Sequence, residues 1–489
     1  MMTKSQEAGR RLWFVLWAGL LAASVNNAFT TQAAKVAEAV VWISVVLTLL
    51  AITQAITCRR AFRQRETALA WSVLAMFFVG QLVHLTIVQA PVPAKNGMDF
   101  SAYYLAGKVV EERPAQTLYD LPLLADGRMN LHTEDSVGSG WDAAARRYHV
   151  PYKSPFIYPP FFAALMIPFV RLSFAGALVA WNAMTVLLVT GAVLLSFDMA
   201  GVRMNGRLAL ITGVGLFSFY PFLLNLSCGQ MGGVLLFLFA GGVWLLSRKQ
   251  VWLSAFCLAL ATLIKLTPAL VVPLLIIHRR WRWLVAYVVW IAVLAGISIE
   301  VTGWAAYAEF WHKALPAMAC GSAVWENTSL MSWVQQMFLG YTPQATAPAQ
   351  LIPAYACKVS KLASLVVYGA FLVLCWTRRK EQNLERWLVV MALLGIATSP
   401  ISWWHHYTLA LLPLIYLWCT MRKGRRCLAG LGMVVGTNVI GIIGLIWQGS
   451  VMLPVLAAVT PILTVAVAFA AVAGKDSLEI AGEAVNARA

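Results

Sequence analysis

Charged side chains are scarce in this chain. Only 12% of its 489 residues are Asp, Glu, Lys or Arg, whereas 60% are hydrophobic and the mean hydropathy is +0.73. A water-soluble globule cannot hide that much apolar surface, so a bilayer must act as the solvent. The composition excludes a soluble domain and predicts a polytopic membrane protein.

The chain also lacks the motifs that bind nucleotides. It has no GxxxxGK[ST] loop, no GxGxxG turn and no DxD carboxylate pair. These motifs cradle phosphates or hold the metal of a sugar nucleotide. A reaction driven by ATP or by a nucleotide sugar is therefore not expected, and we predict no cofactor and no metal.

Apolar segments long enough to form helices recur along the whole chain. A window of about 20 residues, the length that spans a bilayer, predicts an all-α protein with roughly 12–14 membrane helices. The segments lie near 12–30, 36–57, 68–90, 177–199, 208–226, 231–247, 251–264, 266–278, 284–302, 357–376, 387–400, 405–420, 428–446 and 452–473. The first lacks a convincing cleavage site, so we expect it to be retained.

Basic residues occur in short clusters between these segments. If the N-terminus is cytoplasmic, six clusters fall on that side: Arg59/Arg60/Arg63/Arg65, Arg203/Arg207, Arg248/Lys249, Arg279/Arg280/Arg282, Arg378/Arg379/Lys380/Arg386 and Arg422/Lys423/Arg425/Arg426. They act as topology signals, and they are not a nucleic-acid surface despite the net charge of +17. We predict a single membrane domain over 1–474 in the inner (cytoplasmic) membrane, a cytoplasmic tail over 475–489, and outer loops over about 91–175 and 303–355.

The eight cysteines form no CxxC motif, so neither a zinc site nor a redox site is indicated. Cys320 and Cys357 flank the second outer loop. They are candidates for a disulfide in an oxidising compartment, with buried free thiols as the alternative.

Asp99 stands just beyond the apolar run from Leu69 to Ala90. A carboxylate at this boundary suits proton transfer at a membrane surface. The apolar positions that follow recur at helical spacing and predict an amphipathic helix over 99–121 on the membrane surface; they are Phe100, Tyr103, Tyr104, Val109 and Val110. Asp99 then either caps this helix or serves as a base, and the two roles are compatible.

A second aromatic group surrounds a double proline. Tyr158 precedes Pro159 and Pro160, which restrict it to an extended conformation and force a sharp entry into the next helix. Such an aromatic bend suits the face of a sugar or an isoprenoid. The alternative is an aromatic belt at the membrane interface.

Two polar positions interrupt the later apolar segments. Lys265 separates two stretches that are each too short to span comfortably, so we predict a break near the outer surface. A cation there can neutralise an anionic headgroup, or it can snorkel to the interface. Gln230 lies among Gly229, Gly232 and Gly233, and either contacts a ligand or belongs to a tight turn.

His405 and His406 follow Trp403 at the outer end of the segment 387–400. Adjacent residues of a helix point about 100° apart, so the two imidazoles cannot readily bind one metal. One is expected to face a site while its neighbour packs. An imidazole here can hydrogen-bond a phosphate, and an ordinary interfacial histidine is the alternative.

Together these residues resemble glycosyltransferase family 87. The resemblance runs in order over about 95–415 and is carried by Asp99-Phe100-x-x-Tyr103-Tyr104-x-Ala106-Gly107, Tyr158-Pro159-Pro160, Gly229-Gln230, Lys265-x-Thr267-Pro268, Asn327-x-Ser329-Leu330 and Ser399-Pro400-x-Ser402-Trp403-x-His405-His406. It implies a C-type glycosyltransferase fold and a polyprenyl-phosphate sugar donor, usually the mannose form. It also implies inverting α-mannosyl transfer to a glycolipid or polysaccharide, with Asp99 as the catalytic aspartate.

We therefore expect a glycosyltransferase whose site faces the periplasm or the cell exterior. Asp99 is the expected general base, without a metal. Lys265, His405 and His406 are the expected ligands of the donor phosphate. Contacts to the sugar or headgroup are expected from Tyr103, Tyr104, Tyr158, Gln230, Asn327 and Trp403.

Other functions remain compatible with the sequence. Arabinofuranose is an alternative to mannose as the transferred sugar. A transporter or flippase of lipid-linked sugars would share the many helices, although no convincing internal repeat is present. A scaffold subunit would make the aspartate dispensable.

Overall fold

The computed structural model of this protein describes residues 97–112, 117–121, 123, 127, 138–151, 153–204, 212, 216, 219–323, 327–339, 352–380, 384–420 and 452–473. The chain divides into two compact units, Met1–Lys95 with Leu210–Tyr220 and Asn96–Ala209 with Pro221–Ala489. Nearly all described residues belong to the second unit. The predicted spans near 12–30, 36–57, 68–90 and 428–446, about half of 208–226, and the tail 475–489 lie outside the described residues.

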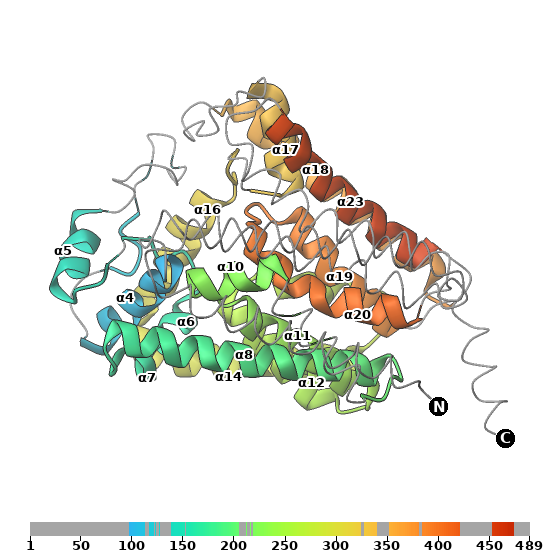
Figure 1. The fold of residues 1–489 in the computed structure, drawn as a ribbon, viewed down its shortest axis with the longest axis horizontal. Coiled ribbons are helices and arrows are strands. Elements are labelled where there is room, and N and C mark those ends of the chain that lie inside the picture. The colour runs from blue at the N-terminus through green and yellow to red at the C-terminus, as the bar shows by residue number, and fades with distance from the viewer. Residues whose placement is uncertain are drawn as a thin grey trace, which may run out of the picture. The chain divides into compact units, whose positions relative to one another are not determined.

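The described part of the chain is all-α, as predicted, and contains no strand. In chain order its elements are α4 (Met98–Glu112), α5 (Ser139–Arg147), α6 (Pro160–Leu165), α7 (Ile167–Val170), α8 (Phe174–Met199), α10 (Tyr220–Cys228), α11 (Gly232–Ser247), α12 (Val251–Ile264), η3 (Thr267–Val271), α13 (Val272–Ile277), α14 (Trp281–Thr302), α15 (Trp304–Glu309), η4 (Phe310–Ala314), α16 (Leu315–Met318), α17 (Leu330–Leu339), α18 (Ala354–Arg378), α19 (Leu384–Thr398), η6 (Trp404–Ala410), α20 (Leu411–Thr420) and α23 (Met452–Ala473) (Figure 1).

Three of these helices are long and apolar enough to cross a membrane: α8, α14 and α18. Shorter apolar helices, among them α11 and α12, also follow the predicted segments closely. The protein is therefore an all-α membrane protein.

Neighbouring helices pack in chain order on one side of the second unit. The helix α8 packs on α11, α11 on α12, and α12 on α14 (Figure 1). A second group forms around α19, which contacts α18, α20 and α23. The two groups meet where α11 contacts α19 and η6. This meeting place is where three helices are interrupted.

The helix α4 does not lie on the surface as the sequence suggested. It ends at Glu112 instead of 121, and ten of its fifteen residues are buried. The aromatic ring of Phe100 packs against Phe174 and Trp181, while Tyr103 packs against Phe162. The apolar positions that resembled a membrane-facing stripe are thus covered by α6, α7 and α8.

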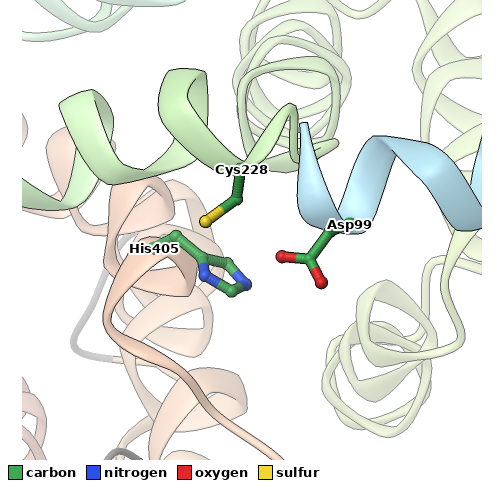
Figure 2. A group of neighbouring side chains, drawn as sticks. All are labelled: Asp99, Cys228 and His405. Atoms are coloured by element: carbon green, nitrogen blue, oxygen red, sulfur yellow. The ribbon is translucent and has the colours of Figure 1, made fainter. Parts of the chain in front are cut away.

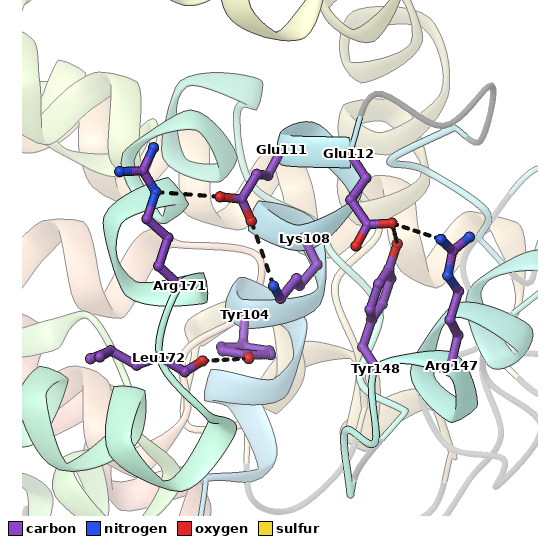
Figure 3. A network of polar contacts seen from close by, with 8 residues as sticks. All are labelled: Tyr104, Lys108, Glu111, Glu112, Arg147, Tyr148, Arg171 and Leu172. Atoms are coloured by element: carbon purple, nitrogen blue, oxygen red, sulfur yellow. Dashed lines mark hydrogen bonds and ion pairs between the residues drawn. The ribbon is translucent and has the colours of Figure 1, made fainter.

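Polar contacts fasten the C-terminal half of α4 to the elements around it. Glu111 lies between Lys108 and Arg171, at 3.5 and 3.4 Å. Glu112 accepts hydrogen bonds from Arg147 and Tyr148 at 2.9 and 2.7 Å (Figure 3). These pairs are partly exposed, so each contributes little free energy, but together they connect α4 to α5 and to the turn before α8.

The aromatic bend before α6 forms where the double proline predicted it. Pro160 occupies the first turn of α6, where the missing N–H costs no helical hydrogen bond. Tyr158 lies in a bend just before the two prolines, and its backbone carbonyl accepts a hydrogen bond from the Tyr119 hydroxyl at 2.7 Å.

Cys320 and Cys357 form a disulfide, with their Cα atoms 5.4 Å apart. This confirms the pairing that the sequence left open. Gln335 of α17 reinforces it, because its amide donates to the Cys320 carbonyl at 2.6 Å and to the Ser360 hydroxyl at 3.1 Å. The disulfide and these bonds tie the segment before α17 to the start of α18.

We predict that Cys320→Ser and Cys357→Ser each lower the thermal unfolding temperature of the purified protein in detergent. The lost crosslink corresponds to about 2–4 kcal/mol. The double variant should be no less stable than either single variant, because all three remove the same bond. Cys257→Ser, at a half-buried free thiol, is the control. Additive losses in the double variant would contradict a crosslink between these two residues.

Candidate functional site

Asp99 lies in the first turn of α4 and is partly buried. It is the second residue of the helix, and Gly97 precedes the helix with a φ of 79°. The Gly97 N–H donates to the Ser227 carbonyl at 2.7 Å, and the Ser154 hydroxyl donates to the Met98 carbonyl at 2.8 Å. The start of α4 is therefore held against the end of α10. The positive end of the α4 dipole favours the ionised carboxylate.

The helix α10 ends beside Asp99 in a Schellman motif. The Gln230 N–H donates to the Asn225 carbonyl at 2.8 Å, and the Gly229 N–H donates to the Leu226 carbonyl at 3.1 Å. Gly229 has a φ of 67°, and a Cβ atom there would stand 2.6 Å from the Cβ of Phe100. Only glycine fits this end. The motif presents Cys228 on one side of the turn and Gln230 on the other.

Asp99, Cys228 and His405 come together from three separate elements. A carboxylate oxygen, the sulfur and a ring nitrogen all lie within 4.8 Å of one another. The side chains of Asp99 and His405 point toward each other, with the Cys228 sulfur beside them (Figure 2). His405 is only 5% exposed, and its Nε2 atom has no hydrogen-bond partner.

The loop that carries the histidines is clamped by Asn327. The Asn327 amide donates to the carbonyls of Ser322 and Pro400 at 2.8 and 3.1 Å. Its oxygen accepts the N–H groups of Ser329 and Ser402 at 3.2 and 2.8 Å. Both donors and both acceptor sites of the amide are thus used by the backbone. Asn327 positions the loop, and its polar atoms are occupied without a sugar.

His406 turns away from its neighbour toward Lys265. The two imidazole rings are nearly perpendicular, at 89°, as expected for adjacent residues. His406 Nε2 lies 2.8 Å from Lys265 Nζ, while its Nδ1 accepts the Trp403 N–H at 3.2 Å. If Nδ1 accepts, a neutral ring carries its hydrogen on Nε2, facing the ammonium. The contact therefore brings more donors than acceptors together, which favours an anionic ligand.

Lys265 occupies the break that the sequence predicted. The helix α12 ends at Ile264, and Lys265 has extended backbone angles of −152° and 132° before η3 begins. Its ammonium interacts electrostatically with Asp99 and with His405. The Lys265–His406 pair and the group of Asp99 and His405 therefore belong to one site.

A largely apolar pocket borders the pair. Its polar lining residues are Lys265, Thr267, Ser399 and His406, and its apolar lining includes Met231, Leu235 and Phe239 of α11, Val271 of η3 and Ile396 of α19, with Met231 standing just before the first residue of α11. Lys265 thus faces both this pocket and the charge of Asp99.

On the other side of Asp99 lies a cluster of hydroxyl and amide groups. The Tyr103 hydroxyl donates to Gln230 Oε1 at 2.7 Å and lies 3.3 Å from the Tyr158 hydroxyl. Burial raises the pKa of Tyr158 well above its ordinary value, and the negative charge of Asp99 raises it further. Tyr158 is therefore a neutral hydrogen-bond donor beside the carboxylate.

The structure brings together most of the residues that the sequence singled out, but Tyr104 lies apart. It donates its hydroxyl hydrogen to the Leu172 carbonyl at 2.7 Å, next to the ion pairs of Glu111 (Figure 3). Trp403 borders the site through its backbone, which pairs with Asn327 and donates to His406 Nδ1. The sequence did not identify Cys228 as a residue of this site, because a cysteine in an apolar segment gives no indication of its neighbours in the fold. Its position just before Gly229-Gln230 was the only sequence feature that could have pointed to it.

Sequence comparisons find relatives of this chain among known proteins. A sequence model described as glycosyltransferase family 87 matches residues 156–400, which is half of the chain. The chain is 29% identical over 301 residues to a polyprenol-phosphate-mannose-dependent alpha-(1-2)-phosphatidylinositol pentamannoside mannosyltransferase of Mycobacterium tuberculosis, covering 60% of this chain and 64% of that protein.

A second relative, from Mycolicibacterium smegmatis, is a polyprenol-phosphate-mannose-dependent alpha-(1-2)-phosphatidylinositol mannoside mannosyltransferase. It is 25% identical over 352 residues, covering 65% of this chain and 72% of that protein. The chain thus spans about two-thirds of the length of these curated relatives.

We predict that Asn327→Leu destabilises the protein by about 3 kcal/mol or more, because it leaves several buried backbone groups without partners. The matched control is Asn182→Leu, which removes a single hydrogen bond to the Leu226 carbonyl. Thermal unfolding in detergent should show a clearly larger loss for Asn327→Leu. Equal losses would mean that the clamp contributes no more than one ordinary bond.

Proposed function

Because the chain belongs to glycosyltransferase family 87, we propose that it transfers mannose from a polyprenyl phosphate to a glycolipid on the periplasmic face of the inner membrane. The proposal rests on one juxtaposition. A partly buried carboxylate, Asp99, lies within 4.8 Å of His405 and within the field of Lys265, which also lines an apolar pocket.

Asp99 is proposed as the general base. An acceptor hydroxyl hydrogen-bonded to the carboxylate becomes more nucleophilic as its proton moves to Asp99. The hydroxyl oxygen then bonds to the anomeric carbon while the bond from that carbon to the phosphate oxygen breaks. Attack from the face opposite the phosphate inverts the anomeric configuration. Tyr103, Tyr158 and Gln230 supply donors and acceptors beside Asp99 for sugar hydroxyls.

Lys265 and His406 are proposed to hold the donor phosphate. Their contact has surplus donors at 2.8 Å, and phosphate oxygens are acceptors that satisfy them. The phosphate leaves as an anion, so the ammonium stabilises the charge that develops in the transition state. No acid is needed to protonate it. His405, which is buried and faces Asp99, orients the reacting groups.

The apolar pocket is the proposed seat of the first isoprene units. It begins at Lys265 and His406 and is walled by apolar side chains of α11, η3 and α19. When the donor phosphate is bound by Lys265 and His406, the isoprenoid chain can therefore extend into the apolar pocket while the phosphate stays among polar groups.

Helix ends support the proposed orientation. Arg248 and Lys249 precede α12 and Lys265 follows it, while α18 carries the disulfide at Cys357 near its start and Arg378 at its end. The site therefore lies opposite the basic residues along α12, and the disulfide lies opposite Arg378 along α18. Basic residues favour the cytoplasmic side, and disulfides persist in oxidising compartments. Both rules support a site on the outer face.

The relatives named above act on phosphatidylinositol mannosides, so a mannosylated glycolipid is the proposed acceptor class.

The first test incubates the purified protein in detergent with a panel of labelled polyprenyl-phosphate sugars and such a glycolipid. We expect label from the mannose donor in the product, with release of polyprenyl phosphate. Transfer from the arabinofuranose donor instead would overturn the choice of sugar, and movement of donor without its cleavage would favour a flippase.

We predict that Asp99→Asn lowers the turnover number in this assay by about 10²–10⁴-fold, the range of a lost general base. The amide keeps the shape of the side chain but cannot accept the proton of the acceptor hydroxyl near neutral pH. Asp142→Asn is the matched control, because Asp142 is a carboxylate of the same outer loop that pairs with Arg146 and Lys153. Wild-type turnover of Asp99→Asn would remove Asp99 from catalysis.

We predict that Lys265→Met raises KM for the lipid donor about tenfold or more. A hydrogen bond to a charged group contributes roughly 1.5–3 kcal/mol, and 1.4 kcal/mol corresponds to a factor of ten. The methionine keeps the apolar stem, so folding should persist. Lys249→Met, at an exposed lysine on the opposite end of α12, is the control. An unchanged KM for Lys265→Met would assign Lys265 to a purely interfacial role.

A further inference from the structure

Cys228 has no part in the proposed transfer, yet its sulfur lies within 4.8 Å of both Asp99 and His405 (Figure 2). Among the residues that the structure describes, this trio is the cluster with the composition of a metal site. The three donor atoms are a thiol sulfur, an imidazole nitrogen and a carboxylate oxygen, and each is a common ligand of zinc.

The distances allow a zinc ion after a small adjustment. Zinc binds sulfur at about 2.3 Å and nitrogen or oxygen at about 2.0–2.2 Å, so tetrahedral ligand atoms stand roughly 3.5 Å apart. The donor atoms here lie within 4.8 Å of one another. The two spacings differ by about 1 Å, a shift of the ligand atoms that rotation about side-chain bonds can supply.

A second observation points to a ligand at the same place. His405 is 5% exposed and its Nε2 atom has no hydrogen-bond partner. A buried polar atom in this state carries an energetic cost that a ligand removes. The imidazole also faces the other two side chains (Figure 2).

The ligand atoms also select the kind of cation. The carboxylate and the thiolate together carry two negative charges, which a bound Zn²⁺ compensates, and the sulfur–metal bond must outweigh the repulsion from the Lys265 ammonium that acts on Asp99 and His405. Magnesium and calcium prefer sets of oxygen ligands, so a thiolate and an imidazole select against them.

We propose that Asp99, Cys228 and His405 form an inhibitory binding site for a thiophilic divalent cation of the zinc class. Binding replaces the thiol proton of Cys228, which leaves to solvent, by a sulfur–metal bond. The same ion takes a lone pair of the Asp99 carboxylate, and that carboxylate can then no longer accept a proton. The inhibition rests on the proposed function of Asp99, whereas the binding does not.

The test of binding uses the purified, detergent-solubilised protein after treatment with a chelator. Equilibrium dialysis against ZnCl₂ should show one ion per chain, and CoCl₂ should produce the absorption of a cobalt–thiolate bond. Cys228→Ser and Cys228→Ala should each weaken zinc binding at least tenfold, whereas Cys257→Ser should not change it. Without any variant, zinc should protect Cys228 from alkylation, measured by mass spectrometry of the peptide.

Transfer assays then separate the two parts of the proposal. Micromolar zinc should lower wild-type and Cys257→Ser turnover at least tenfold, while Cys228→Ala loses this sensitivity and MgCl₂ has no effect. If zinc does not protect Cys228 from alkylation, and if the Cys228 variants bind zinc as tightly as the wild type, the proposed metal site is wrong. Binding at Cys228 with undiminished turnover would overturn the inhibition. Binding by a chain that transfers no sugar from any donor would overturn the proposed function and leave the metal site standing.

Discussion

The need to satisfy backbone hydrogen bonds within a membrane protein governs where this site can be. A helix in a bilayer satisfies its own N–H and C=O groups, so a break is tolerated only where other groups replace the missing partners. Three breaks meet here, after Cys228, at Lys265 and over 399–403. The first is closed by a Schellman motif, and the third by the amide of Asn327 and by the Thr328 N–H, which donates to the Ser402 carbonyl at 2.7 Å.

The same breaks explain why the polar and charged side chains of the candidate site gather where these helices end. An uninterrupted helix presents side chains all round its axis, but an interrupted one turns its terminal side chains toward the gap. Lys265 and His406 meet in this way, 2.8 Å apart, although 141 positions separate them in the chain. Asp99 joins them from the start of α4, where the helix dipole favours its negative charge. A carboxylate and a cation are thus held near each other and near an apolar pocket.

Support for the site comes from farther away. The disulfide from Cys320 to Cys357 anchors the segment that runs on to Asn327, and Asn327 holds the loop leading to His405. Gly321 approaches that loop so closely that a Cβ atom would stand 2.5 Å from the Pro400 carbonyl oxygen. The segment before α17, tied to the start of α18 by the disulfide, therefore positions the loop of the imidazoles through backbone contacts.

Hydropathy and the positions of prolines were enough to predict the class of protein, most boundaries of the described helices, the break at Lys265 and the bend at Pro159 and Pro160, because both act locally along the chain. The order of the polar residues relative to the apolar segments also made Asp99 and the two histidines candidates for a site. The burial of α4, the contacts of Asn327 with the backbone of a loop and the position of Cys228 beside Asp99 emerge only in the folded chain. These outcomes depend on contacts between residues far apart in the chain, and neither periodicity nor composition carries information about such contacts.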